Sequence, residues 1–137
     1  MNTNRLLLGT LAGFVGYFMG GFVLYTMVFK DMLASSNPGM AGVQSEPNML
    51  ALVVGNLAAA FLLAYIFEKW AGIRSLTSGA LAGATIGALI ALSYDSMING
   101  TTTLMTWQGV FTDVLVYGLC SAIGGTLVAF GLSYKRV

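Results

Sequence analysis

Four long apolar stretches follow one another along the chain, separated by short polar segments. Each is close to the ~20 residues that a helix needs to cross the hydrocarbon core of a bilayer. Segment 30–48 is the one long polar connection; it holds both prolines and is expected to form an irregular cap with room for one short helical turn. The pattern predicts an all-α, polytopic four-transmembrane-helix bundle in a single domain, 1–137, with spans at about residues 6–29, 49–67, 76–98 and 108–132.

Small residues repeat at helical spacing in the third stretch. Gly79, Gly83 and Gly87 recur every four residues, and alanines form a second ridge beside them. Helices in lipid associate through close backbone approach, which ridges of small residues permit. Glycine is also frequent in membrane helices generally, but the double ridge favours a packing role. We therefore expect this stretch to be the central helix of the bundle.

The first and fourth stretches carry glycines that are also expected to pack. The glycines of the first stretch fall on one narrow stripe, which we expect to face the glycine ridge of the third helix. Those of the fourth stretch are expected to serve internal contacts or partner subunits. These positions are Gly9, Gly13, Gly16 and Gly20 in the first stretch, and Gly118 and Gly125 in the fourth.

Charge is sparse and unevenly placed. Only 8% of residues are charged, against about 25% in soluble domains. Four spans put both termini on one face, and an excess of basic residues marks the cytoplasmic face of a membrane protein. We therefore predict a bacterial inner-membrane protein with both termini cytoplasmic, and with Trp70 and Trp107 as interface anchors. The terminal face carries Arg5, Lys69, Arg74, Lys135 and Arg136, and the opposite face carries Lys30.

The chain offers little chemistry for catalysis or cofactor binding. It has no histidine and one cysteine, Cys120, which removes most zinc and haem sites and any internal disulfide. Cys120 is expected to be a small buried filler. The net charge of +1 suggests no nucleic-acid role. We expect no catalytic residues, no metal site and no cofactor, so the chain is not predicted to be an enzyme.

Asp95 and Asp113 form the candidate ion or proton site. A short hairpin joins their helices, so the two acids are expected at similar depth near the outer face. An ionisable group at membrane depth is a functional hypothesis by default. Together they would share a proton or bind a cation, with Asn56, Tyr25 and Tyr94 nearby. In the structural alternative, Asp113 complements the start of its helix and Asp95 hydrogen-bonds the following turn.

Two further polar positions are interpreted structurally. Asn56 is expected to join helices through a hydrogen bond rather than to serve as a ligand. Asn99, with the next two residues, matches a glycosylation sequon but lies tight against the membrane, and we interpret it as part of a turn.

The chain also resembles small bacterial four-helix integral membrane proteins of unknown function. The resemblance rests on a glycine-rich first helix that ends in Tyr25, a long first loop, Asp95 near the end of the third helix, and Asp113 near the start of the fourth. It implies a four-helix membrane fold and no assigned activity. Residues 52–56 also look similar to the asparagine segment of small fluoride channels. However, the first helix lacks the arginine of those channels, and it also lacks the glutamate of small multidrug exporters.

Two functions remain open at this point. The first is a non-catalytic accessory or assembly subunit, with the lipid bilayer and other membrane subunits, or a second copy, as partners. The alternative is a small proton- or cation-linked carrier or channel that uses the outer acidic pair. Whether Asp95 and Asp113 meet or lie apart separates the two.

Overall fold

The computed structural model describes residues 1–43 and 46–134, and over them its regular secondary structure consists of helices without strands. The predicted all-α fold with four long apolar helices is confirmed. Lys135 and Arg136, which entered the charge count, lie outside the described residues. The elements are α1 (Thr3–Val23) with the π-helical turn η1 (Leu24–Val28), α2 (Lys30–Ser36), the 3-10 turn η2 (Pro38–Met40), α3 (Met49–Ile66) with the π-helical turn η3 (Phe67–Ala71), α4 (Leu76–Thr101) and α5 (Trp107–Ser133).

Each long helix begins at a polar residue that caps it. The side chains of Asn2, Asn48, Ser75 and Thr106 each accept a hydrogen bond from the backbone N–H three residues later. Such caps satisfy one of the backbone donors that a helix N-terminus leaves free. After η3 the chain turns at Gly72, whose φ of 62° lies in the left-handed region that favours glycine. The polar residues between the apolar stretches therefore set where the helices start and stop.

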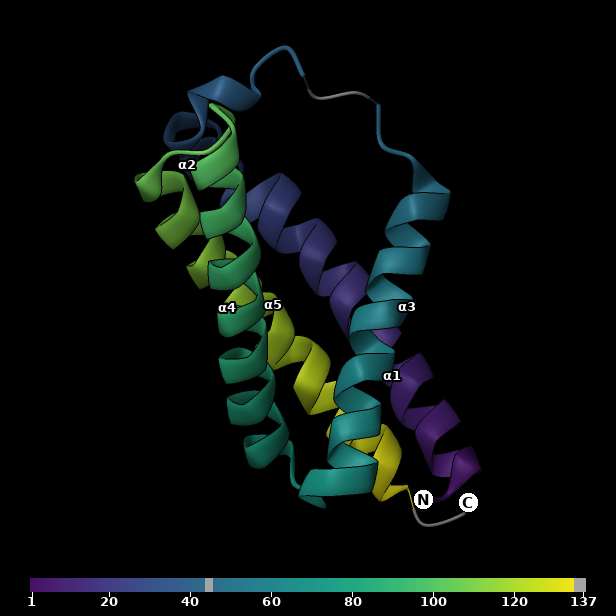
Figure 1. Cartoon of the computed structure of the whole chain (residues 1–137). Helices are drawn as coiled ribbons and strands as arrows, with labels where there is room; N and C mark the ends of the chain where they lie inside the picture. The colour runs from purple at the N-terminus through teal and green to yellow at the C-terminus, as the bar shows by residue number, and fades with distance from the viewer. Residues whose placement is uncertain (44–45, 135–137) are drawn as a thin grey trace.

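The last helix, α5, lies at the centre of the bundle. α4 packs mainly against α5, α1 packs against both α5 and α3, and α3 makes a smaller contact with α5. Figure 1 shows α5 behind and between its neighbours, with α3 and α4 on opposite sides of the molecule. Half of the most apolar window of α5 is buried, compared with 22% for α4. The expectation that the third span, α4, is the central helix is therefore wrong.

Glycines bring α4 and α5 into backbone contact. A Cβ on Gly79 would lie 2.5 Å from the carbonyl oxygen of Gly125, and one on Gly83 would overlap the carbonyl oxygen of Ser121. The helix contact at Gly118 is less tight, because a Cβ added there would lie at an ordinary contact distance of 3.6 Å from the Ala88 methyl. The two helices therefore approach as closely as small residues allow.

The glycine stripe of α1 faces α5 and not α4, so its predicted partner is wrong. A Cβ on Gly9 would lie 2.8 Å from the Leu132 side chain, and one on Gly20 would lie 3.3 Å from Ile123. Gly13 and Gly16 likewise face α5 side chains. The reason is geometric: α5 lies between α1 and α4, so the stripe packs on side chains of α5 and also on its glycines, with Gly131 close to Gly9 and Gly124 close to Gly16.

The two ends of the bundle differ. At the terminal end, where α1 starts and α5 finishes, Leu63, Phe67, Val128 and Leu132 are at most 1% exposed and form a dry core. Glu68 there is ion-paired with Arg74. Its carboxylate also accepts a hydrogen bond from the backbone N–H of Asn2 at 3.0 Å. Among the described residues, the buried side chains of α3 fall only in the half near this end.

The opposite end, hereafter the α2 end, is capped by the chain between α1 and α3. Thr106 donates a hydrogen bond to the carbonyl of Ser36 at 2.6 Å, and the hydroxyls of Ser36 and Thr112 are 3.2 Å apart. The Asn37 side chain occupies the space that Gly109 leaves open on α5. The expected short helical turn is thus a two-turn helix, α2, docked on the start of α5 (Figure 1).

Candidate acidic site

Asp95 and Asp113 lie at matching depth on adjacent helices. Asp95 is six residues before the end of α4 at Thr101, and Asp113 is six residues after the start of α5 at Trp107. At 1.5 Å per residue, each acid is about 9 Å inside its helix end. Asp95 is only 6% exposed, and Asp113 is half-buried. The hairpin therefore brings both carboxyl groups to one level between α4 and α5.

The two carboxyl groups are neighbours. Asp113 is the ionisable group that interacts with Asp95, and two ionised carboxylates would have no proton to share. Asp95 Oδ2 is buried and has no hydrogen-bond partner among the described residues. A buried carboxylate without a donor or counter-charge is strongly unfavourable. The pair is therefore incomplete as it stands.

Tyr25 completes one side of the site. Its hydroxyl donates a hydrogen bond to Asp113 Oδ1 at 2.7 Å. Tyr25 belongs to η1, where the helix widens and the Phe29 N–H bonds the carbonyl of Leu24, five residues back. A π-helical turn shifts the register of the side chains that follow, and such turns are frequent at functional sites. α1, α4 and α5 thus each contribute one oxygen-bearing side chain.

Neither structural alternative for the acids matches this geometry. The cap of α5 is Thr106, whose side chain accepts from the Gly109 N–H at 2.9 Å, and Asp113 is nearly two turns further in. α4 continues to Thr101, so residues 99–101 are helical, and Asn99 donates to the carbonyl of Met105 at 2.8 Å. Asn99 is thus in the helix rather than in a turn, and it ties the hairpin together without Asp95.

Asn56 and Tyr94 are not part of the acidic cluster. Asn56 donates a 2.7 Å hydrogen bond to the carbonyl of Leu52 in its own helix, so the predicted interhelical bond is wrong. The α2-end half of α3 also stands away from α4 (Figure 1). Tyr94 is 65% exposed and lines a shallow surface hollow of about 440 Å³ on α4.

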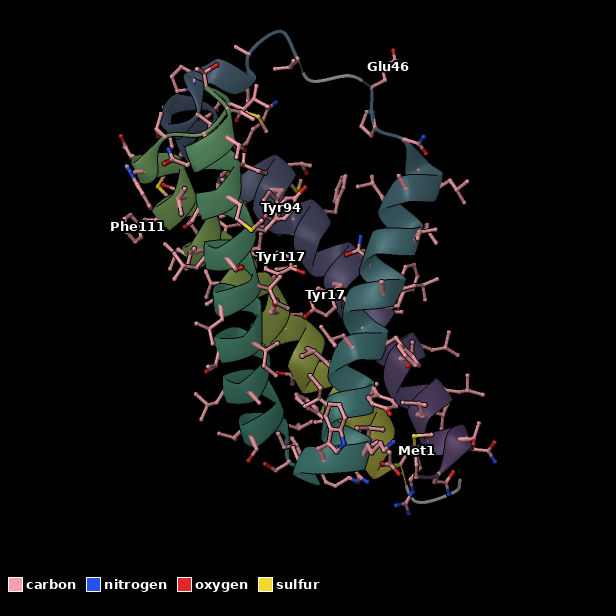
Figure 2. The ribbon with its side chains drawn as sticks, viewed as in Figure 1. Met1, Tyr17, Glu46, Tyr94, Phe111 and Tyr117 are labelled. Atoms are coloured by element: carbon pink, nitrogen blue, oxygen red, sulfur yellow. The ribbon has the colours of Figure 1, made fainter. Side chains whose placement is uncertain are left out.

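A column of polar groups continues from the acids toward the bundle centre. The i, i+4 spacing of Asp113 and Tyr117 predicts that these two share a face of α5, whereas Ser121 and Tyr17 were not singled out from the sequence. On α5, Tyr117 and Ser121 follow Asp113 at intervals of four residues. Ser121 is fully buried against Gly87, and its hydroxyl has no hydrogen-bond partner among the described residues. Tyr17 of α1 is 3% exposed, and its ring centroid is 6.3 Å from that of Tyr117. Figure 2 shows Tyr117 and Tyr17 next to each other, with Tyr17 the lower of the two in this view.

The spacing of the α5 residues would have revealed this column. Positions i, i+4 and i+8 share a helix face, and the three residues on α5 all have oxygen-bearing side chains. The column ends at Ser121, because the residues beyond it toward the terminal end belong to the dry core. Cys120 is 2% exposed, and its thiol lies 3.7 Å from the carbonyl oxygen of Tyr17.

The two tryptophans lie at helix ends. Trp70 is in η3 near the terminal end and is 70% exposed, and Trp107 opens α5 near the α2 end and is 57% exposed. Trp70 meets Tyr65 edge to face, with ring centroids 5.2 Å apart.

Comparison of the chain with protein families, with curated proteins and with solved structures found no match.

Proposed function

We propose that this chain is a non-catalytic, multi-pass protein of the bacterial inner membrane that acts as an accessory or assembly subunit of a membrane complex. Its four helices are long and apolar enough to span a membrane. Lys69 and Arg74 lie between α3 and α4 near the terminal end, and Arg5 lies near the start of α1. This basic cluster supports a cytoplasmic position for the terminal end.

One observation carries the proposal: α3 presents an open stripe of small residues. An added Cβ on Gly55 would meet nothing within 4 Å. Ala51 and Ala58, at intervals of four and three residues from Gly55, are exposed as well. On a helical wheel these residues lie opposite Ala60 and Ala64, which pack into the bundle. The stripe therefore faces away from the other three long helices.

A stripe of this kind suits a helix more than it suits lipid. Large aliphatic side chains make their contacts equally well with acyl chains, whereas small residues let a second backbone approach closely. The glycine stripe of α1, and Gly79, Gly83 and Gly87 of α4, are already covered by α5. The stripe on α3 is a similar surface of small residues that no other described helix covers. We assign it to a transmembrane helix of a partner subunit.

Replacing Gly55 by leucine tests this assignment. The chain would be solubilised from its native membrane in mild detergent and its assembly mass measured by native electrophoresis. We expect wild type in a complex and Gly55→Leu mainly free, because leucine would hold the partner backbone away. Gly100→Leu is the control, since Gly100 is also exposed with open space around it. A complex unaffected by Gly55→Leu, or a wild-type chain that migrates alone, would refute the assignment.

The second candidate is a proton- or cation-linked carrier. The matching depth of Asp95 and Asp113 on adjacent helices favours it, because paired carboxyl groups at membrane depth suit ion or proton exchange. It ranks second because Leu63 and Phe67, with their α5 partners, close the terminal end and leave the polar column without an exit there. Flux into liposomes that carry the purified chain tests it. Flux that is abolished by exchanging both acids for asparagine would favour the carrier, and absence of flux in wild type would eliminate it.

A further inference from the structure

One carboxyl oxygen of Asp95, Oδ2, is buried without a hydrogen-bond partner among the described residues. Asp95 as a whole is only 6% exposed. Its neighbouring ionisable group is Asp113. Because a buried oxygen acceptor needs a donor or a cation, this oxygen points to a missing binding partner.

The groups around the pair supply no positive charge. α5 contributes Asp113 and, one turn on, Tyr117; η1 contributes the Tyr25 hydroxyl. No described lysine or arginine forms an ion pair with either acid. Lys30 and Asp31 of α2 are solvent-exposed. With both acids ionised, the pair would carry a net charge of −2 and would have one donor, the Tyr25 hydroxyl, which bonds Asp113.

We propose that a hard divalent cation with the chemistry of Mg²⁺ or Mn²⁺ binds between Asp95 and Asp113. Its charge matches that of the pair, and carboxylate oxygens are the ligands that such ions prefer. Mg²⁺ commonly keeps several waters and takes only one or two carboxylates from the protein. Asp113 is only half-buried, and its exposed part, near the α2 end, leaves room for those waters. Softer metals are disfavoured, because the Cys120 thiol faces the backbone of Tyr17.

Tyr25 is a positioning residue in this site. Its hydrogen bond to Asp113 Oδ1 holds that carboxyl group so that the other oxygen is free for the ion. Groups that orient a metal ligand in this way typically change the affinity by about 10–100-fold when they are removed. Tyr25→Phe removes only the hydroxyl, so it tests the site with little risk to the fold.

Mn²⁺ is the probe, because its free and bound forms are distinguished by electron paramagnetic resonance. The full chain in detergent micelles would be titrated with Mn²⁺ and then with competing Mg²⁺. We expect one saturable site that Mg²⁺ displaces. Asp95→Asn and Asp113→Asn should each weaken binding at least about tenfold, and Tyr25→Phe about tenfold. The matched control, Asp31→Asn, changes an exposed acid and should leave binding unchanged.

Three outcomes would overturn the proposal. The first is no saturable Mn²⁺ binding by wild type. The second is binding that Asp95→Asn, Asp113→Asn and Tyr25→Phe all leave intact, which would place the ion on the surface. The third is an infrared band of a protonated carboxyl that Mn²⁺ does not remove, which would show that a proton neutralises the pair instead. Circular dichroism of each variant confirms that the helices are retained.

Discussion

Gly79→Ala should destabilise the bundle because α4 and α5 have no space for one extra methyl group at this point. The added Cβ would lie 2.5 Å from the Gly125 carbonyl oxygen and 2.6 Å from the Ala129 methyl. Non-bonded carbon atoms prefer a separation of about 3.5–4.0 Å, so the helices must move apart by about 1 Å. Overpacking of a tight interface costs about 1–3 kcal/mol.

The same exchange at Gly100 provides the matched control. Gly100 is also in α4, but an added Cβ would meet nothing within 4 Å. Both variants gain the same helix propensity of up to about 1 kcal/mol for alanine over glycine, so the difference between them isolates the steric cost. Gly79→Ala should therefore lie about 1–3 kcal/mol below Gly100→Ala in free energy of unfolding.

The assay is reversible unfolding in mixed micelles, with the fraction of an unfolding detergent raised stepwise and tryptophan fluorescence recorded. Trp70 and Trp107 lie near opposite ends of the bundle, so both ends are monitored. A difference below about 0.5 kcal/mol, the usual effect of a surface substitution, would show that the α4–α5 interface adapts to the methyl group, and the assumption of a rigid glycine contact would be refuted.

Three further predictions concern the ends of the bundle. Gly109→Ala should displace Asn37, whose side chain fills the space beside Gly109, and should speed proteolysis of the loop before α3. Thr106→Ala should lower the free energy of unfolding by about 1 kcal/mol, because α5 loses its cap. Thr106→Ser keeps the capping hydroxyl and should retain most of the wild-type free energy of unfolding. Cysteines at the exposed positions Ala41 and Ala71 should react with an impermeant thiol reagent from outside the cell at Ala41 only; labelling at Ala71 alone would reverse the proposed orientation.

Helix positions were predictable because hydropathy and caps are local. Segment 76–98 is apolar since a bilayer offers no water for backbone groups, and Ser75 before it is a favoured cap. The face of α1 that carries the glycine stripe could also be predicted from the residue spacing, but the helix that packs against it could not. Spacing defines a face of one helix, whereas the partner depends on the order in which helices surround α5.

The acidic pair was predictable for a related reason. A short hairpin fixes the relative depth of two adjacent helices, so Asp95 and Asp113 could be placed at one level. The position of Asn56 could not, because α3 diverges from α4 toward the α2 end and an amide can bond a carbonyl of its own helix four residues back. The π-helical turn that presents Tyr25 has no equivalent signal in the residue pattern.

The central position of α5 has a consequence for biosynthesis. α5 follows the other three long helices in chain order, so it leaves the ribosome after them. Until then α4 lacks its main contact, and the glycine stripe of α1 has only α3 beside it. The nascent chain must therefore remain as loosely associated segments, and it becomes a compact unit in one late step when α5 arrives. A chain truncated before Trp107 would never reach that step and would be exposed to membrane proteases that remove unassembled helices.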